Sequence, residues 1–151
     1  MEIERKFLVK KLPESLGQYK KREIEQAYLC NDPVVRVRRD NDEYYLTYKS
    51  KGFIAREEYN LPLTKEAYEH LLAKADGLII TKNRYEIPDG NGLTIELDIF
   101  ERDYEGLVIA EVEFDSLEQA DSYTPPAWFG ADVSKDGRYH NNKMSRKKIH
   151  Y

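Results

Sequence analysis

Cysteine and histidine, which most often build sites for soft metal ions, are scarce in this 151-residue chain. Cys30 is the only cysteine, so the chain can form neither an internal disulfide nor a thiolate metal cage, as is typical of proteins from a reducing compartment. The three histidines, His70, His140 and His150, are too widely separated to predict a zinc site. Any metal ion bound by this protein is therefore expected to have oxygen ligands.

Long apolar runs are also missing. The chain has no stretch of about 18 apolar residues, and near its N-terminus no apolar run follows a basic segment. We therefore expect no membrane span and no signal peptide, and we expect a cytoplasmic protein. The formal net charge of −4 is a small difference between 24 basic and 28 acidic residues, so net charge predicts neither a nucleic-acid partner nor a membrane-surface partner.

Alternation of apolar and polar residues is the dominant pattern that the chain does contain. Hydrophobic residues make up 40% of the sequence, enough for a domain of this size to bury a core. No internal repeat or linker interrupts it, which predicts a single domain over residues 1–151. Period-two alternation is the signal of a β-strand. Eight such runs predict strands at residues 2–8, 23–29, 34–39, 44–50, 54–61, 79–87, 93–100 and 108–114.

Helical signals are few. Between the fifth and sixth strands, apolar residues recur at intervals of three and four, which predicts an amphipathic helix. Thr64 is its expected N-cap and Gly77 its expected C-terminal stop. A second, short helix is expected from Ser116, which begins a capping-box pattern, and it must end before Pro125. A further helical turn is expected within residues 13–19.

The predicted strands have one apolar face and one charged face. Ile95, Leu97 and Ile99 are typical of the apolar face, which is expected to form a core or to lie under helices. The charged face carries the basic residues Lys6, Arg36, Arg38, Lys49, Arg56, Lys82 and Arg84, and the acidic residues Glu2, Glu4, Glu58, Glu86, Glu96, Asp98, Glu111 and Glu113. One interpretation is a polar sheet face that simply points to water.

A closed barrel is the other interpretation. Eight strands can close around an interior wide enough for side chains or one small ligand. We therefore predict a β-dominated α+β fold, an eight-stranded antiparallel barrel with a polar, charged interior and a few covering helices. An open, strongly curved sheet would show the same alternation.

Paired carboxylates favour a ligand-binding interior. Three strands each place two acidic residues at positions i and i+2 on one face, about 6–7 Å apart, namely Glu2/Glu4, Glu96/Asp98 and Glu111/Glu113. A hard cation such as Mg²⁺ or Mn²⁺ would bind between such groups, usually through one or two carboxylates and the phosphates of a substrate. The basic pairs Arg36/Arg38 and Lys82/Arg84 suit phosphate oxygens. Together they predict a site for a polyphosphate carried as its metal complex.

One N-terminal sequence block and six later ones, in order, extend this pattern. The N-terminal Glu2-Ile3-Glu4-Arg5-Lys6 resembles the ExExK signature of the CYTH superfamily, the triphosphate tunnel metalloenzymes. The later blocks resemble the same family, and the likeness covers nearly the whole chain; they are Val35–Arg38, Leu46–Lys49, Arg56–Tyr59, Thr81–Tyr85, Ile95–Asp98 and Ala110–Phe114. The resemblance implies an eight-stranded antiparallel tunnel that binds a triphosphate together with one or two Mg²⁺ or Mn²⁺ ions.

The resemblance also implies roles for individual residues. The metal-side carboxylates would be Glu2, Glu4, Asp98, Glu111 and Glu113, with Glu58 and Glu96 as further candidates. The substrate-binding bases would be Lys6, Arg36, Arg38, Lys49, Arg56, Lys82, Arg84 and Lys143. The catalytic residues would be Glu2, Glu4 and Lys6, whereas Arg5 would lie on the opposite strand face with Ile3 and Phe7.

Hydrolysis of a triphosphate is the activity that the resemblance implies, with inorganic tripolyphosphate as the preferred substrate and nucleoside triphosphates as possible further ones. That preference rests on the short chain, which has no inserted segment suited to an organic group; Trp128 beside Pro125-Pro126 is interpreted as a packing residue. A class IV adenylate cyclase, a thiamine triphosphatase and a non-catalytic module that binds polyphosphate or nucleotide stay open as alternatives. The expected partner is the small triphosphate, and the chain is expected to be a monomer or a homodimer.

Overall fold

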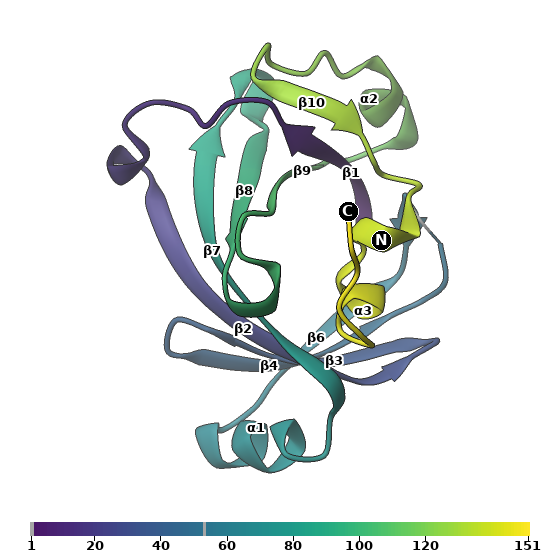
Figure 1. The fold of residues 1–151 in the computed structure, drawn as a ribbon. Helices are drawn as coiled ribbons and strands as arrows, with labels where there is room; N and C mark the ends of the chain where they lie inside the picture. The colour runs from purple at the N-terminus through teal and green to yellow at the C-terminus, as the bar shows by residue number, and fades with distance from the viewer. Residues whose placement is uncertain (1, 53) are drawn as a thin grey trace.

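The structure is a computed structural model that describes residues 2–52 and 54–151. Within them, ten strands form one antiparallel sheet that curves around a central opening (Figure 1). The sheet order is β10-β1-β9-β8-β7-β2-β3-β4-β6, and β5 pairs with β1. The strands are β1 (Glu2–Val9), β2 (Lys20–Asn31), β3 (Val34–Asp40), β4 (Glu43–Lys49), β5 (Ala55–Arg56), β6 (Glu58–Pro62), β7 (Asp76–Pro88), β8 (Thr94–Phe100), β9 (Val108–Glu113) and β10 (Phe129–Asp132).

The barrel closes through β5 and β6, which the sequence pattern predicts as one strand over residues 54–61. In the structure β5 pairs with β1, β6 pairs with β4, and Glu57 lies between them. The backbone of Glu57 is held by Ser50, whose N–H donates to the Glu57 carbonyl at 3.0 Å and whose hydroxyl accepts from the Glu57 N–H at 2.8 Å. The prediction of one strand is wrong here because the chain changes partners at this position. The predicted antiparallel barrel is confirmed, with ten strands among the described residues in place of the predicted eight.

Strand β10 has no counterpart among the eight predicted strands. It is only four residues long, contains Gly130, and pairs with the edge of β1 that does not face β9. A Cβ at Gly130 would lie 3.3 Å from the Leu8 carbonyl oxygen, so the close approach of the two strands favours glycine. So short a strand gives no readable alternation, which explains why it is missed.

Three short helices accompany the barrel: α1 (Lys65–Leu72), α2 (Leu117–Ser122) and α3 (Asn141–Met144). The predicted N-caps are confirmed, since Thr64 accepts from the Ala67 N–H and Ser116 from the Gln119 N–H, each at 3.1 Å. A 3₁₀ turn at Leu16–Gln18 confirms the helical turn expected within residues 13–19. None of the helices within the described ranges has the length and apolar character needed to cross a bilayer.

Gly77 does not stop the first helix, contrary to the prediction. The helix ends at Leu72, and Gly77 lies inside β7 with φ +79. A Cβ at Gly77 would lie 1.9 Å from the Ser145 carbonyl oxygen. Glycine is therefore required here because the C-terminal segment packs closely against β7, and not because it ends the helix.

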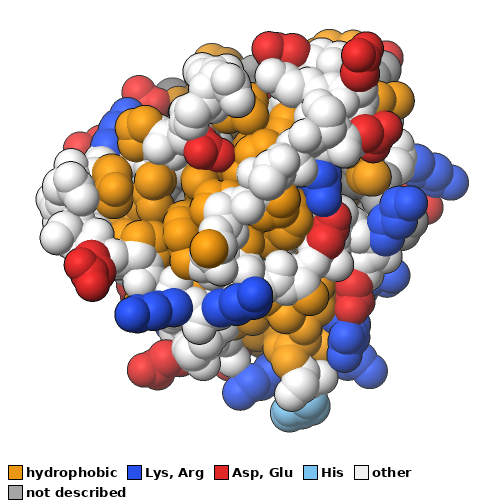
Figure 2. Space-filling view, turned by 90° about the horizontal axis from the view of Figure 1, so that it is seen from above, with side chains coloured by type: hydrophobic (Ala, Val, Ile, Leu, Met, Phe, Trp, Pro, Cys, Tyr) orange, Lys and Arg blue, Asp and Glu red, His pale blue; other side chains and the backbone are white. Residues whose placement is uncertain are grey.

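Two apolar clusters of described residues border the charged part of the barrel interior. One lies under α2 and β10 and includes Phe7, Leu97 and Phe129, with Trp128 packed against it as predicted. Figure 2 views this side of the barrel and shows apolar side chains gathered on it. The other cluster includes Phe100, Ile109 and Met144. Phe100 is paired in register with Lys82, and Ile109 with Asp98, so their side chains point to the barrel interior and fill part of it.

Candidate functional site

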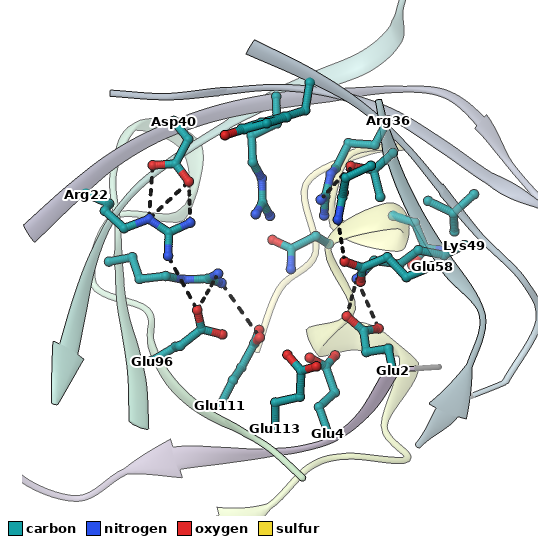
Figure 3. A pocket seen from close by; sticks show the side chains of 18 of the residues that line it. Glu2, Glu4, Arg22, Arg36, Asp40, Lys49, Glu58, Glu96, Glu111 and Glu113 are labelled. Carbon is teal, nitrogen blue, oxygen red and sulfur yellow. Dashed lines mark hydrogen bonds and ion pairs between the residues drawn. The ribbon is translucent and has the colours of Figure 1, made fainter. Parts of the chain in front are cut away.

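A cavity of about 670 Å³ occupies the rest of the barrel interior (Figure 3). Its walls come from all sides of the sheet and from the segment that follows the 3₁₀ turn Gly137–Tyr139. The lining residues are almost all charged or polar. They include the predicted site residues Glu2, Glu4, Lys6, Arg36, Arg38, Lys49, Arg56, Arg84, Glu111 and Glu113, and also Glu58, Glu86 and Glu96.

Three predicted site residues are placed elsewhere. Lys82 and Asp98 do not line the cavity but form a buried ion pair beneath it, with 2.8 Å between Lys82 Nζ and Asp98 Oδ2. Both side chains have 0% exposure. Lys143 lies on α3 with its side chain exposed and packed against Gly137. The structure therefore brings most of the predicted set together and leaves these three outside the cavity wall.

Glu2 already has cationic partners. Lys49 Nζ lies 2.9 Å from Glu2 Oε2, and Arg56 Nε donates to Glu2 Oε1 at 3.0 Å (Figure 3). Burial acts to raise the pKa of Glu2, but Glu58, Lys49 and Arg56 together hold it well below its usual range. Glu2 therefore stays ionised and is largely neutralised within the protein.

Glu111 and Asp98 are neutralised in the same way. Arg84 forks onto Asp98, with Nε to Oδ1 at 2.7 Å and Nη2 to Oδ2 at 2.8 Å. Lys6 Nζ lies 3.2 Å from Glu111 Oε1. Burial opposes ionisation, yet Lys6 and Arg84 hold the pKa of Glu111 well below normal, and Arg84 and Lys82 lower that of Asp98. To ligate a metal ion, either carboxylate would have to exchange an existing ion pair.

Glu4 and Glu113 differ from these carboxylates, because neither forms a close ion pair with a lysine or arginine among the described residues. They are directly opposite each other on β1 and β9 and point into the cavity (Figure 3). The nearest ion-pair partner of Glu4 is Arg56 at 3.9 Å, and Glu113 forms no ion pair with any described residue. Burial and the nearby Glu111 and Glu2 raise the pKa of Glu4 to about 7, and burial with Glu2, Glu58 and Glu96 raises that of Glu113. Like charges directly opposite one another destabilise a sheet.

Two arginines in the cavity wall also have no counter-ion among the described residues. Of the lysines and arginines lining the cavity, Arg36 and Arg38 on β3 are the ones with no carboxylate within ion-pair distance among the described residues. Arg36 is 5% exposed, and its Nε is buried without a hydrogen-bond partner in the described parts of the chain. Burial and the neighbouring Arg36 and Arg84 lower the pKa of Arg38 to about 9. Both guanidiniums are thus left with unused positive charge.

A divalent cation fits this donor set. The described residues contain no group of three or more His, Cys, Asp or Glu side chains arranged to hold a metal by themselves. Magnesium commonly needs only one or two protein carboxylates, because substrate phosphates and water supply the other oxygens. Glu4 and Glu113 provide two such carboxylates, and a cation between them would relieve their repulsion.

Several lining residues were not predicted from the sequence. Arg22 Nε donates to Asp40 at 3.0 Å, and Arg22 Nη1 donates to Glu86 at 2.8 Å. Arg22 and Lys20 continue the alternation of β2, which begins three residues before the predicted strand, so a longer strand prediction would have included them. His140, Asn141 and Asn142 reach the cavity from the C-terminal segment, and no strand pattern could place them.

Comparisons with protein families, known proteins and solved structures all indicate the same kind of protein. Residues 1–138 match the CYTH domain family. An inorganic triphosphatase of Nitrosomonas europaea is 37% identical, covering 95% of this chain and 96% of its own. An inorganic triphosphatase of Acetivibrio thermocellus is also 37% identical, covering 95% of this chain and 92% of its own. A crystal structure of an inorganic triphosphatase, 34% identical, covers 97% of this chain and 95% of its own with a TM-score of 0.72. The chain belongs to the CYTH domain family.

Proposed function

We propose that this chain is a divalent-metal-dependent hydrolase of triphosphates, with inorganic tripolyphosphate as its preferred substrate. The observation that carries the proposal is the placement of unused charge inside one cavity: Arg36 and Arg38 on β3, and Glu4 and Glu113 on β1 and β9. A polyphosphate needs cationic donors and a metal ion at the same time. The named activities of two relatives 37% identical over nearly the whole chain support it.

The arginines would bind the phosphate chain. Arg36 and Arg38 are two residues apart on one strand, so both side chains face the cavity, and guanidinium groups bind phosphate oxygens through two parallel hydrogen bonds. Lys6, Lys49, Arg56 and Arg84 add positive charge from other strands, although each is already paired with a carboxylate. Holding the triphosphate in line with the attacking water supplies much of the rate enhancement.

Glu4 and Glu113 would hold the metal ion, Mg²⁺ or Mn²⁺, with the remaining ligands coming from substrate and water. When bound, the ion supplies positive charge to the phosphate oxygens. Glu4 is also better placed than Glu2 to accept the proton of the attacking water, because it points into the cavity and its nearest cationic partner is 3.9 Å away, whereas Lys49 and Arg56 both bind Glu2. Lys49 and Arg56 make Glu2 a much weaker base.

The composition of the cavity wall favours an inorganic substrate. Among its described lining residues, the apolar or aromatic side chains are Val34, Tyr28, Tyr45 and the imidazole of His140. A nucleobase or a thiazole ring would need a larger apolar surface, as is usual in sites for organic ligands. Action in the cytoplasm, with which the single cysteine agrees, is part of the same proposal.

The test is phosphate release from tripolyphosphate, ATP and thiamine triphosphate, each with Mg²⁺, with Mn²⁺ or with EDTA. We expect kcat/KM for tripolyphosphate to exceed the values for both organic substrates by about tenfold or more, and activity to be lost in EDTA. Preference for an organic triphosphate would overturn the substrate assignment. Formation of cyclic AMP and pyrophosphate from ATP would indicate a cyclase, and binding without turnover would indicate a non-catalytic module.

Arg5 provides a test of which face of β1 points into the cavity. Its side chain points away from the cavity and binds Asp132 at 2.9 Å and the Ala120 carbonyl at 2.7 Å. Arg5→Ala should change tripolyphosphate kcat/KM by less than about threefold and lower the free energy of unfolding by about 1 kcal/mol, since the bond to Asp132 is partly exposed to solvent. Kinetics and urea denaturation measure the two effects. Loss of activity without loss of stability would contradict the assigned facing.

A further inference from the structure

Arg36 and Arg38 are held in place by neutral side chains. Arg38 Nε donates to the Gln26 amide oxygen at 2.8 Å, and Arg36 Nη2 donates to the Thr47 hydroxyl at 3.3 Å. Gln26 is 0% exposed and Thr47 is 1% exposed. Neither contributes charge, so each orients a guanidinium and leaves its positive charge unused.

Gln26 is the register partner of Arg38 across β2 and β3. Its position beneath the guanidinium is therefore fixed by the sheet backbone. A glutamate has nearly the same shape as glutamine and would accept the same hydrogen bond, with an added ion pair. A carboxylate at this position would give the buried Arg38 a counter-ion, which it lacks among the described residues, and would lose only the amide's 3.5 Å hydrogen bond to the Tyr28 hydroxyl. With a neutral amide as its partner, the buried guanidinium keeps an uncompensated charge, which is unfavourable to the folded state.

Thr47 belongs to a directional hydrogen-bond chain across β3, β4 and β6. It is paired in register with Arg36 on one side and with Asn60 on the other. The Thr47 hydroxyl donates to Asn60 Oδ1 at 2.6 Å, and Asn60 Nδ2 donates to Glu58 Oε1 at 2.9 Å. Because its proton is used for Asn60, the hydroxyl presents a lone pair to Arg36. The negative charge of Glu58 is thus kept two side chains away from the guanidinium.

The paired arginines of the cavity show the contrast. Arg22 is held by Asp40 and Glu86, and Arg84 is held by Asp98. Carboxylates are thus available on neighbouring strands, yet the register places an amide and a hydroxyl beside Arg38 and Arg36. Among the described arginines that line the cavity, Arg36 and Arg38 are the ones held by neutral side chains in place of carboxylates.

We propose that Gln26 and Thr47 are positioning residues that orient Arg38 and Arg36 without neutralising them, so that both guanidiniums keep their full charge for the triphosphate. This inference rests on the proposed function, since it assigns the two arginines to substrate binding. It adds residues that act through the arginines and that do not themselves touch the substrate.

Gln26→Glu is the sharpest test, because it separates stability from affinity. The introduced carboxylate should pair with Arg38 and compete with phosphate, so KM for tripolyphosphate should rise about tenfold or more with a smaller change in kcat. The melting temperature of the ligand-free protein should stay the same or rise. Gln119→Glu makes the same charge change on α2, far from the cavity, and should alter neither quantity.

Thr47 gives a second, independent test that does not depend on the folding of the first variant. Thr47→Val keeps the shape of the side chain but removes the acceptor, and should raise KM about threefold to tenfold, whereas Thr47→Ser should restore it. Thr81→Val is the matched control, because the buried Thr81 hydroxyl has no hydrogen-bond partner in the described parts of the chain and lies outside the cavity wall.

The outcomes distinguish this inference from the proposed function. Affinity for tripolyphosphate is also measured by calorimetry in EDTA, where no turnover is expected. A wild-type protein that binds tripolyphosphate but releases no phosphate would refute the hydrolase assignment, and weaker binding by Gln26→Glu would still support the positioning role. Unchanged KM and affinity in Gln26→Glu, or a rise in KM matched by a fall in melting temperature, would overturn the inference.

Discussion

Replacing Glu4 by glutamine is expected to reduce tripolyphosphate hydrolysis by about 100-fold or more while making the metal-free protein more stable at pH 8. The loss of activity follows from the loss of one of two carboxylates proposed to hold the cation. The gain in stability follows from the position of Glu4, which is buried and lies directly opposite Glu113. Without a cation, its negative charge is unfavourable to the folded state.

The pH dependence has a defined sign. The folded-state pKa of Glu4 is about 7 and its ordinary value is 4.5, so the folded protein binds more protons than the unfolded chain between these values. The stability associated with protonated Glu4 is present below about pH 4.5 and is lost as pH rises towards 7. Glu4→Gln removes this loss and should raise the free energy of unfolding by on the order of 1–3 kcal/mol at pH 8, and by much less at pH 5.

Urea denaturation in EDTA at the two pH values measures the stability effect, and steady-state kinetics with Mg²⁺ measures the activity. Glu14→Gln is the matched control, because Glu14 is exposed and lies outside the cavity wall. A Glu4→Gln protein that is less stable than wild type at pH 8, or that retains full activity, would refute the role assigned to this carboxylate.

Replacing Arg38 by methionine should have a comparably large effect on catalysis. Arg38 has no carboxylate partner among the described residues, so methionine removes substrate-binding charge without leaving a buried carboxylate unpaired. We expect kcat/KM for tripolyphosphate to fall about 100-fold or more, with most of the loss in KM. The free energy of unfolding should change little, because the unpaired buried charge itself is unfavourable.

Arg22→Met makes the same substitution at a paired arginine of the cavity. It would leave Asp40 without its ion-pair partner and Glu86 with only the weaker contact to Lys20, so it should lower the free energy of unfolding more than Arg38→Met does, and it should raise KM less. Kinetics and denaturation of the two variants give this comparison directly. If Arg38→Met were the more destabilising and the less harmful to KM, the assignment of unused charge to Arg38 would be wrong.

The barrel was predictable because its strands alternate so clearly. Glu2, Glu4 and Lys6 on one strand, or Arg36 and Arg38 on another, already identify the face that points inward. The interruption at Glu57 was not predictable from alternation, since it reflects a change of strand partner that only the closed sheet imposes. The alternation of polar and apolar residues predicts which face of the sheet a side chain lies on. It does not predict where a strand changes its pairing partner.

The candidate site was predictable as a set of charges but not as a set of pairs. The sequence does not show that Lys82 and Asp98 neutralise each other beneath the cavity, or that Lys49 and Arg56 both bind Glu2. Those pairings depend on register and side-chain reach. They divide the predicted residues into paired groups that build the cavity and a smaller number whose charge is free for a ligand.

The most direct measurement is a crystal structure with Mn²⁺ and a non-hydrolysable triphosphate analogue, in which the ion is located by its anomalous scattering. We expect Mn²⁺ bound by Glu4 and Glu113, and phosphate oxygens bound by Arg36 and Arg38. An ion held by Asp98 after loss of its pairs with Lys82 and Arg84, or a triphosphate bound outside the barrel, would contradict it.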